Sequence, residues 1–135
     1  MPQPFRRCST TLTLLLTGLL GCRGATAPDA CDGTLDVAVT PGVTPTIMWS
    51  PSCGISALVV SPEPGDGTSG TAVWAFSVSE LAPLGPGVRY GRLPRGATEL
   101  NPAQSLRAGA SYRVYVWYTV GGDVIGAWGT RVFVP

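Results

Sequence analysis

The most regular strand pattern in the chain is Ser111-Tyr112-Arg113-Val114-Tyr115-Val116-Trp117-Tyr118-Thr119-Val120. Tyr112, Val114 and Val116 recur at every second position, the spacing that places alternate side chains on opposite faces of a β-strand. A second run of this kind, Val124 to Val134, follows after Gly121-Gly122. A Gly-Gly pair between two such runs is typical of a two-residue hairpin turn. The sequence therefore predicts an antiparallel hairpin as the strongest element of the fold.

Shorter runs with the same alternation lie before this hairpin. They are Leu35 to Thr40, Ile47 to Trp49, Ile55 to Val60, Thr71 to Val78, Val88 to Gly91 and a short one around Glu99-Leu100. The chain of 135 residues holds 18 glycines and 13 prolines, and turn residues of this kind separate the runs. About seven short strands within about 100 residues are typical of a single β-sandwich, so the predicted fold class is all-β.

The apolar side chains of these strands are expected to point between two sheets. The predicted core consists of Leu35, Val37, Ile47, Trp49, Leu58, Val60, Trp74, Phe76, Tyr112, Val114 and Val116. Trp49 is expected to be central, because a buried aromatic side chain contributes more apolar area than any aliphatic one.

The segment Leu106-Arg107-Ala108-Gly109-Ala110-Ser111-Tyr112-Arg113-Val114-Tyr115-Val116 resembles the Leu-x-x-Gly-x-x-Tyr-x-Val-x-Val motif of fibronectin type III domains. The run from Pro45 to Pro51 is similar to that family's second strand, with its buried tryptophan. The resemblance covers roughly residues 34–134. It implies an immunoglobulin-like sandwich in which the hydroxyl of Tyr112 bonds back to upstream backbone. No Arg-Gly-Asp lies between the last two strands, so the resemblance implies a fold and no particular ligand.

The amino-terminal segment has the composition of a secretory leader. Arg6 and Arg7 precede an apolar run from Leu12 to Leu20, which is too short for a membrane-spanning helix of about 20 apolar residues. The run closes on Leu19-Leu20-Gly21-Cys22, which resembles the lipobox of bacterial lipoprotein precursors. That resemblance implies cleavage before Cys22, acylation of this cysteine, and anchorage to a membrane of the cell envelope. Two alternatives stay open: a secretory signal cleaved elsewhere, and an uncleaved anchor.

The lipobox divides the chain into three predicted parts: a signal peptide over 1–21, a lipidated tether over 22–33 and a sandwich domain over 34–135. Arg23, and not aspartate, follows Cys22, which within the lipoprotein family favours the outer membrane in organisms that have one. Cys8 leaves with the leader. The two cysteines that remain, Cys31 and Cys53, are predicted to form one disulfide, as an exported protein permits.

Composition argues against several classes of function. After Cys22 the chain carries seven arginines against eight carboxylates, which is not the basic footprint that nucleic acid requires. It has no histidine and no lysine, so the common catalytic arrangements built on these residues are missing. The carboxylates are scattered, and a metal site would lack ligands. We therefore expect a protein that is not an enzyme and needs no cofactor or metal.

One cluster of charge is notable: Arg89, Arg92 and Arg95. Two interpretations stay open, a solvated strand edge and a contact with an anion or a lipid headgroup.

The hairpin also predicts a candidate binding face. A two-residue turn pairs Val120 with Asp123, Tyr115 with Trp128, and Trp117 with Gly126. The side chains expected on the outer face are Arg113, Tyr115, Trp117 and Trp128. Such a face is either cross-strand packing or a platform for sugar rings or a protein partner. A bulge or a longer turn would instead bury Trp128.

Two classes of function remain. The first is a non-catalytic binding or display module for a protein or a glycan on the cell envelope. The second is a structural or accessory subunit of a larger envelope complex. A broad aromatic face favours a glycan, and an apolar strand edge favours a protein partner.

Overall fold

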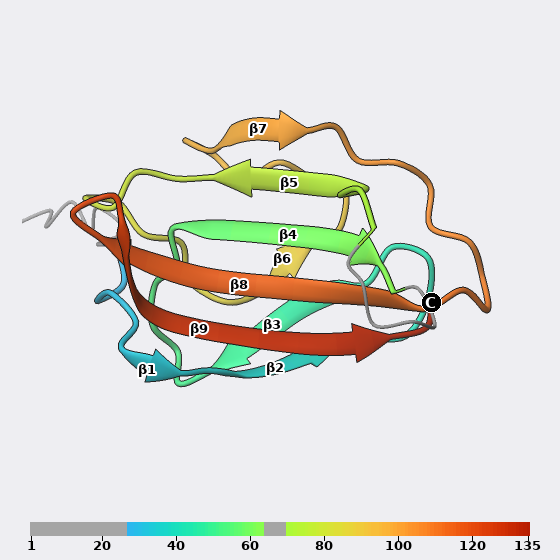
Figure 1. Ribbon diagram of the computed structural model, residues 1–135, viewed down its shortest axis with the longest axis horizontal. Coiled ribbons are helices and arrows are strands. Elements are labelled where there is room, and N and C mark those ends of the chain that lie inside the picture. Colours follow the sequence, from blue (N-terminus) through green and yellow to red (C-terminus); the bar gives the residue numbers. More distant parts are fainter. Residues whose placement is uncertain (1–26, 64–69) are drawn as a thin grey trace, which may run out of the picture.

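A computed structural model of the protein describes residues 27–63 and 70–135. Its strands are β1 (Gly33–Thr34), β2 (Asp36–Val39), β3 (Thr46–Ser50), β4 (Ala57–Pro62), β5 (Trp74–Ser77), β6 (Val88–Arg89), β7 (Thr98–Asn101), β8 (Tyr112–Val120) and β9 (Val124–Phe133). They form a six-stranded sheet in the order β1-β9-β8-β4-β5-β7 and a three-stranded sheet in the order β2-β3-β6. The described residues form no helix, and the two sheets pack as a β-sandwich (Figure 1). The predicted all-β fold class is confirmed.

Apart from β1, which was not predicted, each strand overlaps a predicted run, although several are shorter and β4 ends two residues later than predicted. The run predicted over Thr71 to Val78 forms a strand only over Trp74–Ser77. The strand at Glu99-Leu100 is β7, which extends the large sheet beyond β5. All pairs except β1 with β9 are antiparallel.

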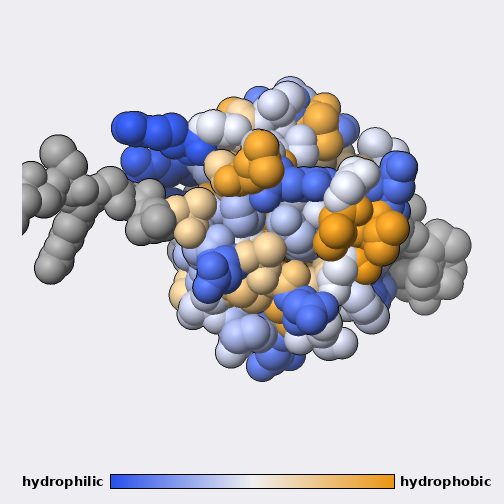
Figure 2. Space-filling view, turned by 90° about the vertical axis from the view of Figure 1, so that its left-hand side faces the viewer, coloured by the Kyte–Doolittle hydropathy of each residue, from blue (hydrophilic) through white to orange (hydrophobic). Residues whose placement is uncertain are grey.

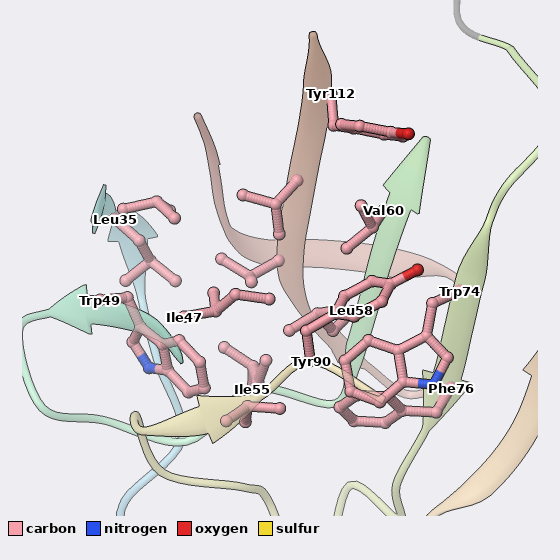
Figure 3. Close-up of a cluster of buried hydrophobic side chains, with 14 of the residues drawn as sticks. Leu35, Ile47, Trp49, Ile55, Leu58, Val60, Trp74, Phe76, Tyr90 and Tyr112 are labelled. Atoms are coloured by element: carbon pink, nitrogen blue, oxygen red, sulfur yellow. The ribbon is translucent and has the colours of Figure 1, made fainter. Parts of the chain in front are cut away.

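The core lies between the two sheets and contains every side chain predicted for it. Figure 3 shows Ile47 and Trp49 of β3 on one side of this layer and Leu58 and Val60 of β4 on the other. All the predicted core residues are buried, and the core also includes Ile55, Val88, Tyr90, Leu106 and Ala127. In β3 and β8 the buried side chains alternate with more exposed ones, and these buried faces pack against each other between the sheets.

The turn before β8 has the geometry that the resemblance implied. The hydroxyl of Tyr112 accepts a hydrogen bond of 3.0 Å from the backbone N–H of Arg107, five residues upstream. Leu106 is buried beside it, and Gly109 adopts a positive φ of 78°. These three features hold the chain in a tight corner where it enters the large sheet.

The predicted disulfide is present and lies at the edge of the core. Cys31 and Cys53 are bonded, with their α-carbons 4.9 Å apart. Cys31 is buried, its N–H donates to the carbonyl of Gly54 at 2.8 Å, and Ala30 forms a bridge with Gly54. The packed domain therefore begins before residue 34, and residues 30–33 belong to the fold and not to a tether. The disulfide and the backbone contacts with Gly54 hold residues 30 and 31 against the sandwich.

β9 packs closely against β2 and the residue that precedes it, Leu35. A β-carbon built on Gly129 would lie 2.6 Å from the backbone oxygen of Leu35 and 2.8 Å from a methyl group of Val37. Only glycine leaves room for this contact. The face of β9 that points away from this contact is turned toward solvent, and the candidate site lies on it.

Candidate functional site

The candidate face is formed by β8 and β9, and their register differs from the prediction. Val120 pairs with Val124, so the turn has three residues and not two. A bulge between Tyr118 and Thr119 then shifts the pairing by one more residue. Trp117 consequently lies opposite Trp128. The predicted pairs Val120–Asp123, Tyr115–Trp128 and Trp117–Gly126 are therefore wrong.

The predicted side of the sheet is nevertheless correct for Trp128. Each one-residue shift sends the side chains of β9 to the opposite face, so two shifts restore the original one. The extra residue at the bulge is Gly126, which lies between Ile125, the partner of Thr119, and Ala127, the partner of Tyr118. An isolated glycine within a strand pattern is a known signal of a bulge, and it could have identified this register.

The aromatic side chains of this face surround a small depression. Trp128 is 53% exposed, while Tyr115 and Trp117 are partly buried. These three side chains and Ile125 line a depression of about 160 Å³, whose base includes Val116 and Gly129. Ile125 was missed by the sequence prediction because the bulge determines where its side chain lies. The result is an apolar surface that one small side chain could fill.

Arg113, the fourth residue predicted for this face, is held by an ion pair. Its Nη2 lies 2.6 Å from Oε1 of Glu63, and its Nε donates to Oε2 at 2.7 Å. The hydrogen bonds from Arg113 lower the pKa of the Glu63 carboxyl, and the same bonds raise the pKa of Arg113. The charge of Arg113 is therefore paired with Glu63 at the edge of the face.

Polar side chains beside the depression are also hydrogen bonded within the protein. Thr130, opposite Tyr115, donates to the carbonyl of Val114 at 2.9 Å. Thr119 donates to the carboxylate of Glu80 at 2.8 Å. The same carboxylate accepts the backbone N–H groups of Gly121 and Gly122, at 3.1 and 2.8 Å. Glu80 therefore stabilises the turn that sets the register of the face.

The arginine cluster forms a separate feature. Arg89, Arg92 and Arg95 line a depression of about 490 Å³ together with the loop 84–88. None of the three has an ion pair with a carboxylate among residues 27–63 and 70–135. All three are exposed.

Several predicted features lie outside the described residues. These are the leader over 1–21, the lipobox Leu19-Leu20-Gly21-Cys22 and the tether up to residue 26. Within the described residues, no group of three or more Cys, Asp or Glu side chains could hold a metal ion. No helix in the described part of the chain is long and apolar enough to cross a membrane.

Comparison of the chain with protein-family models, curated proteins and solved structures finds no match.

Proposed function

We propose that this protein is a cell-envelope lipoprotein, anchored through Cys22, whose β-sandwich is a non-catalytic module that binds a protein partner. The observation that carries the proposal is the pairing of Trp117 with the half-exposed Trp128 across the outer face. Large aromatic side chains in a solvent-exposed depression are the residues most enriched at the centres of protein interfaces.

The surroundings of the depression favour a protein over a glycan. Sugar recognition needs hydrogen-bonding groups beside the stacking ring, because sugar hydroxyls must exchange water for other partners. Here Arg113 is bound to Glu63, and Thr119 and Thr130 are bound within the fold. The lining of the depression is apolar and is formed mainly by the rings of Tyr115, Trp117 and Trp128 together with Ile125. An apolar anchor side chain from a partner protein matches this chemistry.

The Leu19-Leu20-Gly21-Cys22 motif and the disulfide support the proposed location. A disulfide that ties the start of a domain to its core is suited to an oxidising compartment outside the cytoplasm. Two or more acyl chains at Cys22 would give durable anchorage, whereas one would bind only marginally.

A capture experiment with a matched control tests the binding face. Trp128→Ala removes an exposed aromatic side chain of the face, and Leu100→Ala removes a side chain of similar exposure, 59% against 53%, from β7 at the far edge of the sheet. Each variant is used as bait on envelope extracts, and retained proteins are identified by mass spectrometry. We expect the parent and Leu100→Ala to retain the same partner, and Trp128→Ala to lose at least tenfold of it.

Two outcomes would overturn this proposal. Undiminished capture by Trp128→Ala would show that the aromatic side chains serve only packing. Binding of the parent to purified envelope polysaccharide, abolished by Trp128→Ala, would reassign the face to a glycan. Thermal melting of each variant shows that it is folded before it is compared.

A further inference from the structure

We propose that the depression lined by Arg89, Arg92 and Arg95 binds the anionic headgroups of the membrane to which the chain is anchored. This inference rests on the proposed attachment of lipid at Cys22, and it concerns a surface separate from the aromatic face. The three arginines lie within seven residues of sequence and line one depression of about 490 Å³.

The arginines are presented by a well-anchored segment. The N–H of Tyr90 donates to the carbonyl of Pro45 at 2.8 Å, and its hydroxyl donates to the carbonyl of Gln104 at 2.7 Å. A turn closes with the N–H of Arg92 on the carbonyl of Arg89 at 3.1 Å. Tyr90, which lies in sequence between Arg89 and Arg92, is therefore buried and hydrogen bonded, while the arginines are exposed.

Among the described residues, these arginines form a cluster of cations without an ion-pair partner. Arg113 is neutralised by Glu63, but no carboxylate of the described residues lies within ion-pair distance of Arg89, Arg92 or Arg95. Three unneutralised guanidinium groups around one hollow attract phosphate oxygens, because each presents a fork of N–H donors.

One margin of the depression, formed by the loop 84–88, lies beside Pro28, near the start of the described chain. Pro28 packs beside the loop that lines the depression: a β-carbon built on Gly85 would be 3.6 Å from Cγ of Pro28. Six residue steps separate Cys22 from Pro28, and six extended residues reach at most about 20 Å. A lipid on Cys22 therefore holds this end of the sandwich close to the bilayer, whereas the carboxyl terminus lies at the other end (Figure 1).

Apolar side chains at the same end favour a lipid surface over an acidic polysaccharide. Val120 and Val124 flank the turn of the β8–β9 hairpin, and Leu81 follows Glu80, whose carboxylate binds that turn. Leu81 is 95% exposed, and both valines are more than half exposed. Figure 2 looks onto this end and shows orange apolar patches among strongly hydrophilic side chains. Aliphatic side chains beside cations are what the headgroup boundary of a membrane accepts.

Binding of the unlipidated chain to vesicles tests the proposal. The chain from residue 22 with Cys22→Ser contains the whole core and the disulfide, so we expect it to fold, and thermal melting checks this. It is mixed with vesicles of phosphatidylcholine alone or with phosphatidylglycerol added, and bound protein is measured by sedimentation. We expect binding only to the anionic vesicles, weakened by salt, because charges beyond about 10 Å are screened at 0.1 M.

A matched pair of variants locates the binding site. R92Q/R95Q removes two charges from the depression, and R107Q/R131Q removes two exposed charges elsewhere, so both variants have the same net charge. An arginine near an anionic surface strengthens binding about fivefold. We expect R92Q/R95Q to lower the partition coefficient about 25-fold and R107Q/R131Q to lower it less than about threefold.

Each alternative outcome overturns the inference. Equal losses of vesicle binding in the two double variants would mean that the net charge of the domain, and not the depression, determines binding. Binding to neutral vesicles, or none to anionic ones, would exclude headgroup recognition. Retention on an immobilised acidic polysaccharide without vesicle binding would assign the arginines to that ligand, and competition by millimolar inorganic phosphate would indicate a site for free anions. An unmodified Cys22 in the cell would contradict the proposed lipid anchor and not the binding of headgroups, because the vesicle assay uses a chain without the lipid.

Discussion

The indole Nε1 of Trp49 donates a hydrogen bond of 2.9 Å to the backbone carbonyl of Cys53, one of the two disulfide residues. The central tryptophan of the smaller sheet is thus bonded to the segment that the disulfide ties to residue 31. Trp74, the corresponding large side chain of β5, is also buried, but its Nε1 has no hydrogen-bond partner among the described residues. The two tryptophans therefore differ in their polar contacts more than in their burial.

This difference predicts unequal effects of the same substitution. Trp49→Phe leaves the carbonyl of Cys53 without its donor, whereas Trp74→Phe removes a donor that had no acceptor. A lost hydrogen bond at a buried site costs about 1–3 kcal/mol. We expect Trp49→Phe to lower the free energy of unfolding by about 1–2 kcal/mol more than Trp74→Phe, as measured by urea titration. Equal losses would show that the indole N–H groups are irrelevant and that only the cavities matter.

Trp49→Ala should lower the free energy of unfolding more than Trp49→Phe does, because it removes the whole aromatic side chain. Trp49 is buried, and truncating a buried aromatic side chain costs about 3–5 kcal/mol through lost burial and the cavity left behind. We expect a melting temperature far below that of the parent in differential scanning calorimetry. A variant that melts within a few degrees of the parent would show that Trp49 is not central to the core.

Two glycines of β9 should respond differently to the same added methyl group. At Gly129 the new atom would meet the backbone oxygen of Leu35, which cannot move without separating the sheets. At Gly126 its nearest neighbour would be a terminal methyl group of Val120 at 3.0 Å, and that side chain is exposed and can rotate. We expect Gly129→Ala to cost about 1–3 kcal/mol of unfolding free energy and Gly126→Ala less than about 1 kcal/mol. A tolerated Gly129→Ala would refute the close approach of β9 to β2.

Tyr90 predicts a loss of stability at alkaline pH. Burial raises the pKa of Tyr90 from 10.0 to about 12, with a further contribution from Tyr112. The folded state therefore keeps the phenol proton that the unfolded chain releases above pH 10. The stabilising contribution is complete below pH 10 and is lost as the pH rises from 10 to about 12.

Tyr90→Phe isolates this effect. The variant has no phenol to ionise at position 90, so its unfolding free energy should fall less steeply between pH 10 and about 12 than that of the parent. At pH 7 it should be about 1 kcal/mol less stable, because the carbonyl of Gln104 loses its donor. Parallel curves for the two proteins in alkaline urea titrations would contradict the prediction.

Lipid attachment at Cys22 predicts a defined processing defect. Cys22→Ala removes the thiol that would carry the acyl group, and we expect an unprocessed precursor or a soluble product in place of a membrane-bound one. Cys8→Ala is the control, because Cys8 would leave with the leader and its loss should not change processing. Intact-mass measurement of the mature protein decides the matter: an unmodified Cys22 on membrane-bound material would exclude the anchor.

The faces of the strands and the membership of the core followed from the sequence, because the alternation of side chains in a strand is a local property with a fixed period. For this reason Val114 and Val116 could be placed in the core and Tyr115 and Trp117 outside it. The disulfide followed as well, since only Cys31 and Cys53 remain after Cys8 and Cys22 are assigned to other roles. The corner at Tyr112 followed from a motif whose members lie within eleven residues.

Register and distant partners were decided only by the folded chain. Trp117 faces Trp128 because a three-residue turn, held by Glu80, combines with a bulge at Gly126. The alternation of side chains gives the face on which each residue lies, but it does not give the residue opposite to it on the next strand. That register depends on how whole strands pack together. Arg113 likewise forms an ion pair with Glu63, fifty residues away along the chain. The loop that lines the arginine depression packs beside Pro28. Contacts between segments so far apart are set by the packing of the two sheets, and no local pattern encodes them.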